Sequence, residues 1–404
     1  MKKFMVVVVM AAAATSAFAQ GDAIKGILKA KTYSEAQSLI QSSLSSLDNE
    51  QKAKAYNKLV QLSLEKVHKE EAVINSNSVA QQLQQGKVEA YDTIGLYDGV
   101  YNALKDAMEC DQYDAMPNAK GKVSPKFHKS NQEALWPLRV HLINAGQDAA
   151  EKNIEGGALK YFGMYVESYS SKLFADRDKA KWPNDMYVGQ VARAASATAF
   201  QNKDLDLANK YCDVALTDTS SYKDALNLKL YLMQQTLKTR EDSLKCLEQF
   251  ETLYAKDKNE TIFSNLASMY GNLGMKDKQN AVVNEMISIN PKSYFAYAIK
   301  GQAEMNDKKW DEAIADYKKA IEIDPKKSII YTYVGFCYNS KAADAQDDAT
   351  MKSLLKESVV YLEKARDLDP NRDEANWAYP LYQCYYTLYG EADSRTQELS
   401  SLVK

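Results

Sequence analysis

The residues that could perform chemistry are few and scattered along the sequence. The three histidines, His68, His128 and His141, have no partner at metal-ligand or catalytic spacing. The sequence also lacks H-E-x-x-H, G-x-S-x-G, G-x-x-x-x-G-K and G-x-G-x-x-G, the motifs of zinc, hydrolase, phosphate and dinucleotide sites. The pattern therefore predicts a protein with no catalytic residue, no bound metal and no cofactor.

The cysteines and the acidic residues leave little further chemistry open. No C-x-x-C pair occurs, and each cysteine stands alone in an apolar helical pattern, so we expect small buried residues and no disulfide framework. A pair of carboxylates can hydrolyse a glycosidic bond without a local motif. The chain holds 54 acidic residues and so offers many such pairs. An enzyme built on a helical scaffold therefore stays open as the less favoured alternative. The cysteines are Cys110, Cys212, Cys246, Cys337 and Cys384.

The charge of the chain argues against nucleic acid as a partner. The 404 residues carry 51 Lys and Arg against 54 Asp and Glu, a formal charge of −3, with no basic stripe. Clustered cations on phosphates supply most of the free energy of nucleic-acid binding, and such a cluster is missing here. Only 16 Gly and 8 Pro interrupt the sequence. This composition favours long helices in a repeat array over one compact core.

The N-terminus has the pattern of a secretory signal peptide. Two lysines precede an apolar run over 4–14, and 17–19 reads Ala-Phe-Ala, with small residues where a signal peptidase reads. The run is too short to span a bilayer, which takes about twenty residues. Gln20 stands where a lipoprotein would need a cysteine. We expect cleavage after Ala19 and a periplasmic or secreted mature protein without stable membrane insertion.

A 34-residue repeat is visible in the C-terminal half. Pro291 and Pro325 each end a short Ile-Asn or Ile-Asp string and lie one such period apart. Counting by that period, aromatic and small residues recur in columns whose spacing of three, four and seven marks one helical face. The columns hold Phe263, Tyr297 and Tyr331; Ala267, Gly301 and Gly335; and Tyr270, Glu304 and Tyr338.

These columns resemble the tetratricopeptide repeat family over about 260–372. The resemblance implies an all-α fold, a right-handed α-α superhelix of helical hairpins whose concave face binds a protein or peptide. Glu304 departs from the family pattern, in which a tyrosine is usual at that position. Pro380, aligned with the slot of Gly335, breaks the last first-helix and predicts a capping unit.

The small residues of the columns predict close packing of neighbouring helices. Gly301 and Gly335 would let two backbones approach, and the proline after each second helix stops that helix. Between Gly335 and Pro370 the spacing is eleven residues longer than in the repeat. The segment 342–350, rich in Ala and Asp, holds the insertion, and we expect it to form an extended inter-helix turn.

Upstream of residue 260 the helical periodicity continues more weakly. Stretches with Pro and Gly at 111–129 and 175–185 read as loops or as boundaries between sub-arrays. We expect a signal peptide over 1–19, N-terminal helical repeats over 20–111, central helical repeats over 112–223, and C-terminal repeats with capping helices over 224–404.

A helix turns 100° per residue, which places a second set of side chains away from the packed columns. We predict that these side chains form a ribbon of apolar anchors flanked by amides, and that the partner binds there. The alternative is that the phenylalanines are core residues. The predicted partner-binding residues are Phe295, Gln302, Asn306, Ile329, Phe336, Asn339, Trp377 and Tyr385.

A protein or peptide is the predicted partner, because these positions hold mixed apolar and amide groups and no cationic clamp for a terminal carboxylate. A glycan is the alternative ligand. The chain would then resemble SusD-like outer-membrane receptors, which also carry such repeats and hold glycans with aromatic residues. Gln20 in place of an acylated cysteine argues against that resemblance. The segment 377–389 is too aromatic all round for one buried stripe, so we expect part of it to be exposed.

Overall fold

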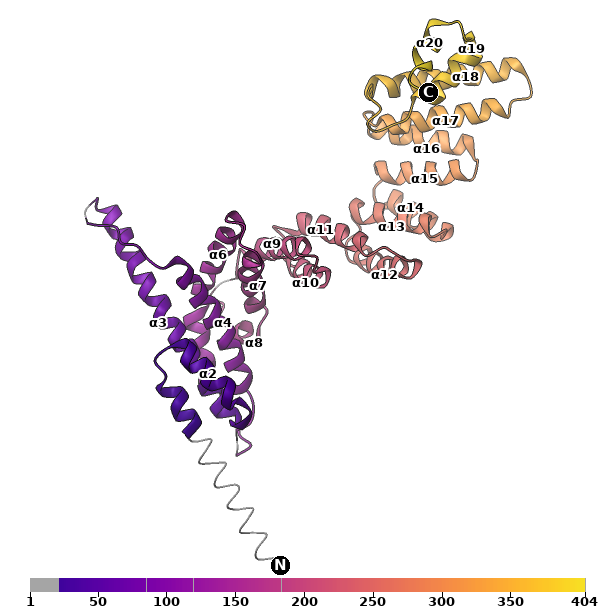
Figure 1. Cartoon of the computed structure of the whole chain (residues 1–404). Helices are drawn as coiled ribbons and strands as arrows, with labels where there is room; N and C mark the ends of the chain where they lie inside the picture. Colours follow the sequence, from indigo (N-terminus) through magenta and orange to yellow (C-terminus); the bar gives the residue numbers. More distant parts are fainter. Residues whose placement is uncertain (1–21, 85, 119, 183, 404) are drawn as a thin grey trace, which may run out of the picture. The chain divides into compact units, whose positions relative to one another are not determined.

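A computed structural model describes residues 22–403 except 85, 119 and 183 (Figure 1). The predicted signal peptide and the cleavage point before Gln20 lie outside the described residues. Within this part of the chain every regular element is an α-helix or a short 3-10 turn, so the predicted all-α hairpin fold is confirmed. The chain divides into two compact units, Met1–Leu232 and Met233–Lys404. The finer boundaries expected at 111/112 and 223/224 stay predictions.

The N-terminal unit is a set of helices around a long hairpin. Residues 22–29 are helical. The longest helix begins at a capping box, in which Asp48 and Gln51 satisfy each other's backbone N–H groups. The elements are α2 Tyr33–Ser43, η1 Leu44–Ser46, α3 Asn49–Gln82, α4 Thr93–Asp114, α5 His128–Leu135, η2 Pro137–Arg139, α6 Val140–Glu151, α7 Gly157–Tyr169, α8 Lys172–Ala175, α9 Val188–Gln201, α10 Leu205–Ala215 and α11 Tyr222–Gln235, whose last residues belong to the second unit.

The core of this unit is shared by α3, α4, α6, α7 and α9. One buried ion pair crosses it: Arg139 Nη1 lies 2.7 Å from Asp185 Oδ2, and both side chains are almost fully buried. The guanidinium also lies over the rings of Trp136 and Tyr165. The three side-chain nitrogens of Arg139 donate hydrogen bonds to Ser168, to Asp185 and to the carbonyl of Tyr165. Arg139 therefore fixes the start of α6 against α7 and the loop before α9.

The C-terminal unit contains the clear repeats. Its hairpins pair α13 with α14, α15 with α16 and α17 with α18. Asn290 and Asp324, each directly before a proline, are the C-caps of α14 and α16, as the sequence predicts. The elements are α12 Arg240–Lys256, α13 Glu260–Asn272, α14 Lys276–Ile289, α15 Tyr294–Asn306, α16 Trp310–Ile323, α17 Ser328–Ala343, α18 Asp348–Leu368, α19 Ala378–Tyr389 and α20 Ser394–Ser400.

The small-residue columns pack as predicted. A Cβ placed on Gly301 would lie 2.8 Å from Cδ1 of Tyr317, and one on Gly335 would lie 2.4 Å from Cγ of Leu362. Tyr317 and Leu362 are fully buried, so neither can move aside. The close approach of first and second helices in the α15–α16 and α17–α18 hairpins therefore depends on glycine.

The segment 342–350 differs from the extended inter-helix turn that the sequence predicted. It does not form an extended turn: α17 continues to Ala343, α18 begins at Asp348, and the connection is short. Asp347 accepts a hydrogen bond from the backbone N–H of Thr350 and caps α18. The extra residues lengthen both helices of this hairpin, because Ala-rich sequence favours continued helix.

Tyrosine hydroxyls join neighbouring elements throughout both units. Each donates a hydrogen bond to a carboxylate of a different element, at distances from 2.5 to 3.3 Å. In three cases a lysine, Lys160, Lys210 or Lys278, binds the same carboxylate. The pairs are Tyr33–Asp106, Tyr97–Asp148, Tyr161–Asp98, Tyr165–Asp185, Tyr211–Glu167, Tyr270–Glu251 and Tyr385–Glu363.

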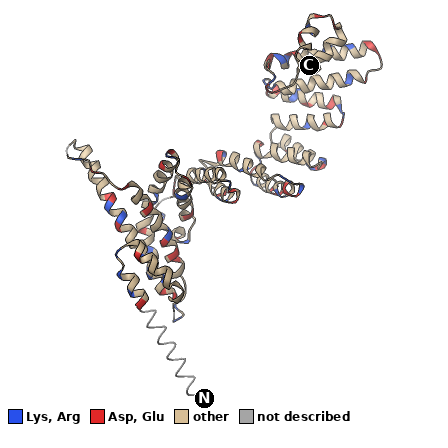
Figure 2. Cartoon of the chain, viewed as in Figure 1, with Lys and Arg blue, Asp and Glu red and all other residues tan. Residues whose placement is uncertain are grey.

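The structure also shows where the cysteines and the charged residues lie. The five cysteines are buried and free, as expected of small core residues. Acidic and basic residues are interspersed over both units (Figure 2). Among the described helices, none combines the length and the apolar character that a membrane span requires.

Gly335→Leu should lower the free energy of unfolding by roughly 1–3 kcal/mol, the usual cost of overpacking a core, because the new side chain meets Leu362. Urea denaturation of the variant and of the wild type measures the difference. Gly26→Leu is the matched control, since a Cβ at Gly26 has no neighbour within 4 Å. Equal stability of the Gly335 variant and the wild type would show that the register of the repeats is wrong.

Candidate functional site

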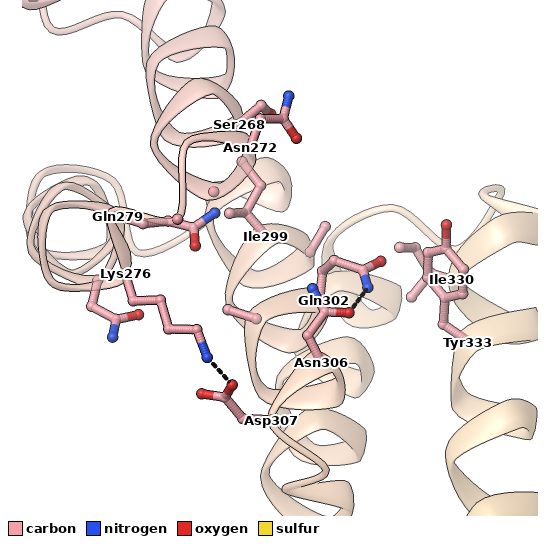
Figure 3. Close-up of a pocket in the computed structure, with 15 residues that line it drawn as sticks. Ser268, Asn272, Lys276, Gln279, Ile299, Gln302, Asn306, Asp307, Ile330 and Tyr333 are labelled. Atoms are coloured by element: carbon pink, nitrogen blue, oxygen red, sulfur yellow. Dashed lines mark hydrogen bonds and ion pairs between the residues drawn. The ribbon is translucent and has the colours of Figure 1, made fainter. Parts of the chain in front are cut away.

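The candidate site is a cavity of about 400 Å³ in the C-terminal unit, between α13, α14, α15 and α17 (Figure 3). The first helices of three successive hairpins contribute to it, and the α13–α14 turn closes one end. Seven of its 15 lining residues carry an amide or a hydroxyl group, and the others are mainly small or aliphatic. The lining residues are Ser268, Gly271, Asn272, Gly274, Lys276, Gln279, Asn280, Ala298, Ile299, Gln302, Ala303, Asn306, Asp307, Ile330 and Tyr333.

Two predicted residues, Gln302 and Asn306, lie in the middle of this cavity. They stand one turn apart on α15, and Gln302 Nε2 donates a hydrogen bond to Asn306 Oδ1 at 3.0 Å (Figure 3). In the described part of the chain, Gln302 Oε1 and Asn306 Nδ2 have no partner. The pair thus offers one free acceptor and one free donor side by side, which is the pattern that a peptide group complements.

The charged residues of the cavity neutralise each other. Lys276, at the start of α14, and Asp307, just after α15, form an ion pair at one end of the cavity (Figure 3). Gln279 Nε2 donates to the carbonyl of Ala267 at 3.0 Å and so joins the two helices of its hairpin. No free acid or base therefore stands among the lining residues that the structure describes.

The two predicted phenylalanines flank the cavity and do not line it. Phe295 and Phe336 are each 45% exposed, so the alternative of a core position is wrong for both. Phe295 contacts the ring of Tyr294, with centroids 5.3 Å apart, and Phe336 contacts Trp310 at 6.4 Å. Ile329 is half-buried against the core beneath.

Three predicted residues do not join this surface, which corrects the sequence-based ribbon. Asn339 donates to the carbonyl of Pro380 at 3.0 Å and so ties α17 to α19. By the repeat period Ser340, not Asn339, corresponds to Asn306, and a slip of one residue turns a side chain by 100°. Trp377 and Tyr385 are only 2% and 1% exposed.

The burial of these two aromatic residues has a simple cause. Trp377 Nε1 donates to the carbonyl of Asp369 at 2.7 Å, and Tyr385 donates to Glu363. The lengthened α17–α18 hairpin shifts the register, so that Tyr385 takes the packed position, corresponding to Gly335, that Pro380 was expected to take. The exposed aromatic residues of α19 are Tyr379, Tyr386 and Tyr389, which confirms that part of this cluster is exposed.

Sequence reasoning missed Asn272, Ile299 and Tyr333, which line the cavity. The signal was present: Asn272 lies one repeat period before Asn306, and Ile299 lies one period before Tyr333. Applying the period to every exposed position of α15, instead of to the phenylalanines and amides alone, would have found all three.

A buried carboxyl pair lies behind the cavity, between α15 and α16. Glu304 occupies the column that holds a tyrosine in the neighbouring hairpins, next to Asp316, whose Oδ2 is 2.7 Å from Lys300 Nζ. Burial, together with the hydrogen bond and charge of Asp316, raises the pKa of Glu304 from 4.5 to about 7. One lysine therefore pairs with two acids, and Glu304 gains its proton as the pH falls through about 7.

His128 is the one histidine with two carboxylate partners in the described part of the chain. Its Nδ1 lies 2.5 Å from Asp111 and its Nε2 2.9 Å from Asp176. Burial opposes protonation, but the two hydrogen bonds outweigh it and raise the pKa of His128. Since both ring nitrogens hold α4 and the turn after α8 in place, the imidazole bridges helices. Among the described residues, this group included, no cluster of three or more His, Cys, Asp or Glu could hold a metal.

The family model of the tetratricopeptide repeat matches residues 294–327, which comprise the α15–α16 hairpin and the turn that follows it. No curated protein matches the sequence. Solved structures similar to the chain include a tetratricopeptide repeat protein from Parabacteroides merdae, with 14% identity and a TM-score of 0.37 over 66% of this chain and 93% of that one.

Two further solved structures are similar to the chain at the same level. MamA from Desulfovibrio magneticus shows 15% identity and a TM-score of 0.34, covering 46% of this chain and 97% of its own. Human IFIT1 shows 14% identity and a TM-score of 0.38, covering 82% and 73%. At such TM-scores no functional property of these proteins extends to this chain.

Glu304→Gln should flatten the dependence of stability on pH. The pKa of Glu304 is raised on folding, so its contribution to stability is complete below about pH 4.5 and is lost as the pH rises through about 7. Between about pH 5 and pH 8 the melting temperature of the variant should fall less than that of the wild type. Glu322→Gln, an exposed acid of the same hairpin, is the control. An unchanged pH dependence would contradict the buried carboxyl pair.

Proposed function

We propose that the protein is a non-catalytic repeat scaffold, and that it binds a protein or peptide partner on the face formed by the first helices of its C-terminal hairpins. One observation carries this proposal. The paired amides of Gln302 and Asn306 present a free acceptor and a free donor in a cavity of about 400 Å³, and exposed Phe295 and Phe336 flank it.

The chemistry of this surface suits recognition and not reaction. A peptide group that pairs with the two amides exchanges water hydrogen bonds for protein ones at little cost. Apolar side chains beside it would cover Phe295 and Phe336, and burial of aromatic surface supplies most of the binding free energy in such interfaces. Lys276 and Asp307 are paired with each other, so the cavity offers no general acid or base for a reaction.

The double variant Phe336→Ala with Gln302→Ala should weaken partner binding by at least about 1.4 kcal/mol, a factor of ten, while the melting temperature changes little. The partner is captured from the envelope fraction with the wild-type protein, and its affinity for both forms is measured by calorimetry. Val360→Ala is the control, because it removes an apolar side chain that is 63% exposed on the second helix α18.

Two outcomes would overturn this assignment. In the first, the melting temperature of the double variant falls sharply while the folded remainder keeps its affinity, which would place Phe336 in the core. In the second, a glycan-array screen gives strong binding and no protein is captured, which would favour a sugar as the ligand.

We also propose that the chain is exported and processed after Ala19. The basic start, the apolar run over 4–14 and the small residues at 17–19 support this. Intact mass of the protein recovered from cells should match a chain that begins at Gln20, with or without cyclisation of that glutamine. A species that keeps the first nineteen residues, or one that carries lipid, would contradict the proposal.

A further inference from the structure

The first helices of the C-terminal unit share a surface without a single Lys, Arg, Asp or Glu. We call it the charge-free face and define it by four positions on each of four helices, all of them exposed or half-buried. It consists of Thr261, Asn265, Ser268 and Asn272 on α13; Phe295, Ile299, Gln302 and Asn306 on α15; Ile329, Tyr333, Phe336 and Ser340 on α17; and Tyr379, Gln383 and Tyr386 on α19, with Gly390 as the C-cap of that helix.

The register of the helices places these positions on one side of the unit. From α13 to α15 to α17 each position recurs after one repeat period, and from α17 to α19 the four positions recur together at a longer, constant offset. The contacts agree with this alignment. Ile330 of α17 lines the cavity beside α15, and Pro380, which corresponds to Ile330 on α19, accepts a hydrogen bond at its carbonyl from Asn339 of α17.

The absence of charge is specific to this face. Charged residues make up 26% of the whole sequence, and in this unit they concentrate on the second helices. α16 alone holds Asp311, Glu312, Asp316, Lys318, Lys319 and Glu322, whereas the four first helices turn their few charges toward neighbouring helices or carry them at their ends.

We infer that the partner segment is an uncharged extended polypeptide that lies across the four first helices with its aromatic or aliphatic end on α17 and α19 and its hydrogen-bonding end on α13. This inference rests on the proposed function and specifies the partner. A charged side chain of the partner on this face would lose hydration without gaining an ionic partner among the positions that define the face. The face therefore selects against charge.

The side chains of the charge-free face change from polar on α13 to aromatic on α17 and α19, and this change sets the direction in which the partner segment lies. The four α13 positions hold only hydroxyl and amide groups, while α17 and α19 hold Phe336 and three tyrosines. Tyr379 and Tyr386 are 51% and 48% exposed, so their rings are available for apolar contact. Gln302 and Asn306, between the two ends, can pair with the backbone of the segment.

The dimensions set the length of the segment. Packed helices lie about 8–10 Å apart, so three steps from α13 to α19 cover at most about 30 Å. An extended chain rises about 3.3 Å per residue, and a segment of about nine residues therefore spans the face.

The test uses an array of nine-residue peptides and the full mature chain. Peptides of Asn, Ser, Thr and Gln with two aromatic residues at one end should bind, in at least one of the two chain directions. The same peptides with two Lys or two Glu at the polar end should bind at least about tenfold more weakly. A screen of neutral oligosaccharides is run in parallel.

A charge reversal on the protein gives the sharper result. Ser268→Glu, at an exposed position of α13, should weaken the neutral peptides and strengthen those with lysine at the polar end, each by at least about tenfold. Ser288→Glu makes the same change on the second helix α14 and should leave the preference unchanged. The melting temperatures of both variants should match that of the wild type.

The outcomes separate this inference from the proposed function. If the bound peptides are charged, if Ser268→Glu does not change the preference, or if only oligosaccharides bind, the inference is wrong. If no peptide binds but the captured partner still depends on Phe336 and Gln302, the face binds a folded surface: the inference then fails while the proposed function stands. If neither depends on the face, both fail.

Discussion

The hydrogen bond from a tyrosine hydroxyl to a carboxylate on a neighbouring element is the interaction on which both units depend. A helical repeat buries its apolar stripe only against its neighbours, so large rings must fill the gaps that small residues leave. A buried tyrosine needs a partner for its hydroxyl, and in pairs such as Tyr211–Glu167 and Tyr270–Glu251 an acid of the adjacent helix accepts the bond. Ring and hydroxyl together fix both the distance and the rotation between two helices. Seven tyrosines, of the 27 in the sequence, are held in this way.

The way the hairpins pack also determines which side chains remain on the exposed side of the first helices. The packed side of each first helix is committed to rings and glycines, as at Gly301 against Tyr317. Charges are placed mainly on the second helices, where they solubilise the unit and form exposed ion pairs of little energetic value. What remains on the first helices is a surface of amides, hydroxyls and exposed rings, on which Gln302 and Asn306 are held by one turn of α15. The proposed partner-binding surface therefore follows directly from how the hairpins pack.

The repeat period was sufficient to predict the helices from α13 to α16, their proline-terminated ends and two residues of the cavity. It failed where the period itself changes. The insertion before α18 lengthened two helices and so changed the repeat period. The expected alignment of Pro380 with Gly335 was therefore wrong, and it put Trp377 and Tyr385 on the exposed face, whereas both are buried. The contacts of His128 with Asp111 and Asp176 could not be predicted, because they join segments 17 and 48 residues apart through loops that follow no repeat.

Glu304 stands in the column where the adjacent hairpins carry tyrosine, and it makes the free energy of opening differ from one hairpin to the next. In a solenoid each hairpin opens with its own free energy, since it contacts only its neighbours. Above neutral pH the half-buried Glu304 and the buried Asp316 share one lysine in the α15–α16 hairpin, which lowers the free energy that holds this hairpin closed. It is also the middle of the cavity. Opening of this hairpin would take Gln302 and Asn306 out of the cavity, while the neighbouring hairpins keep their own contacts.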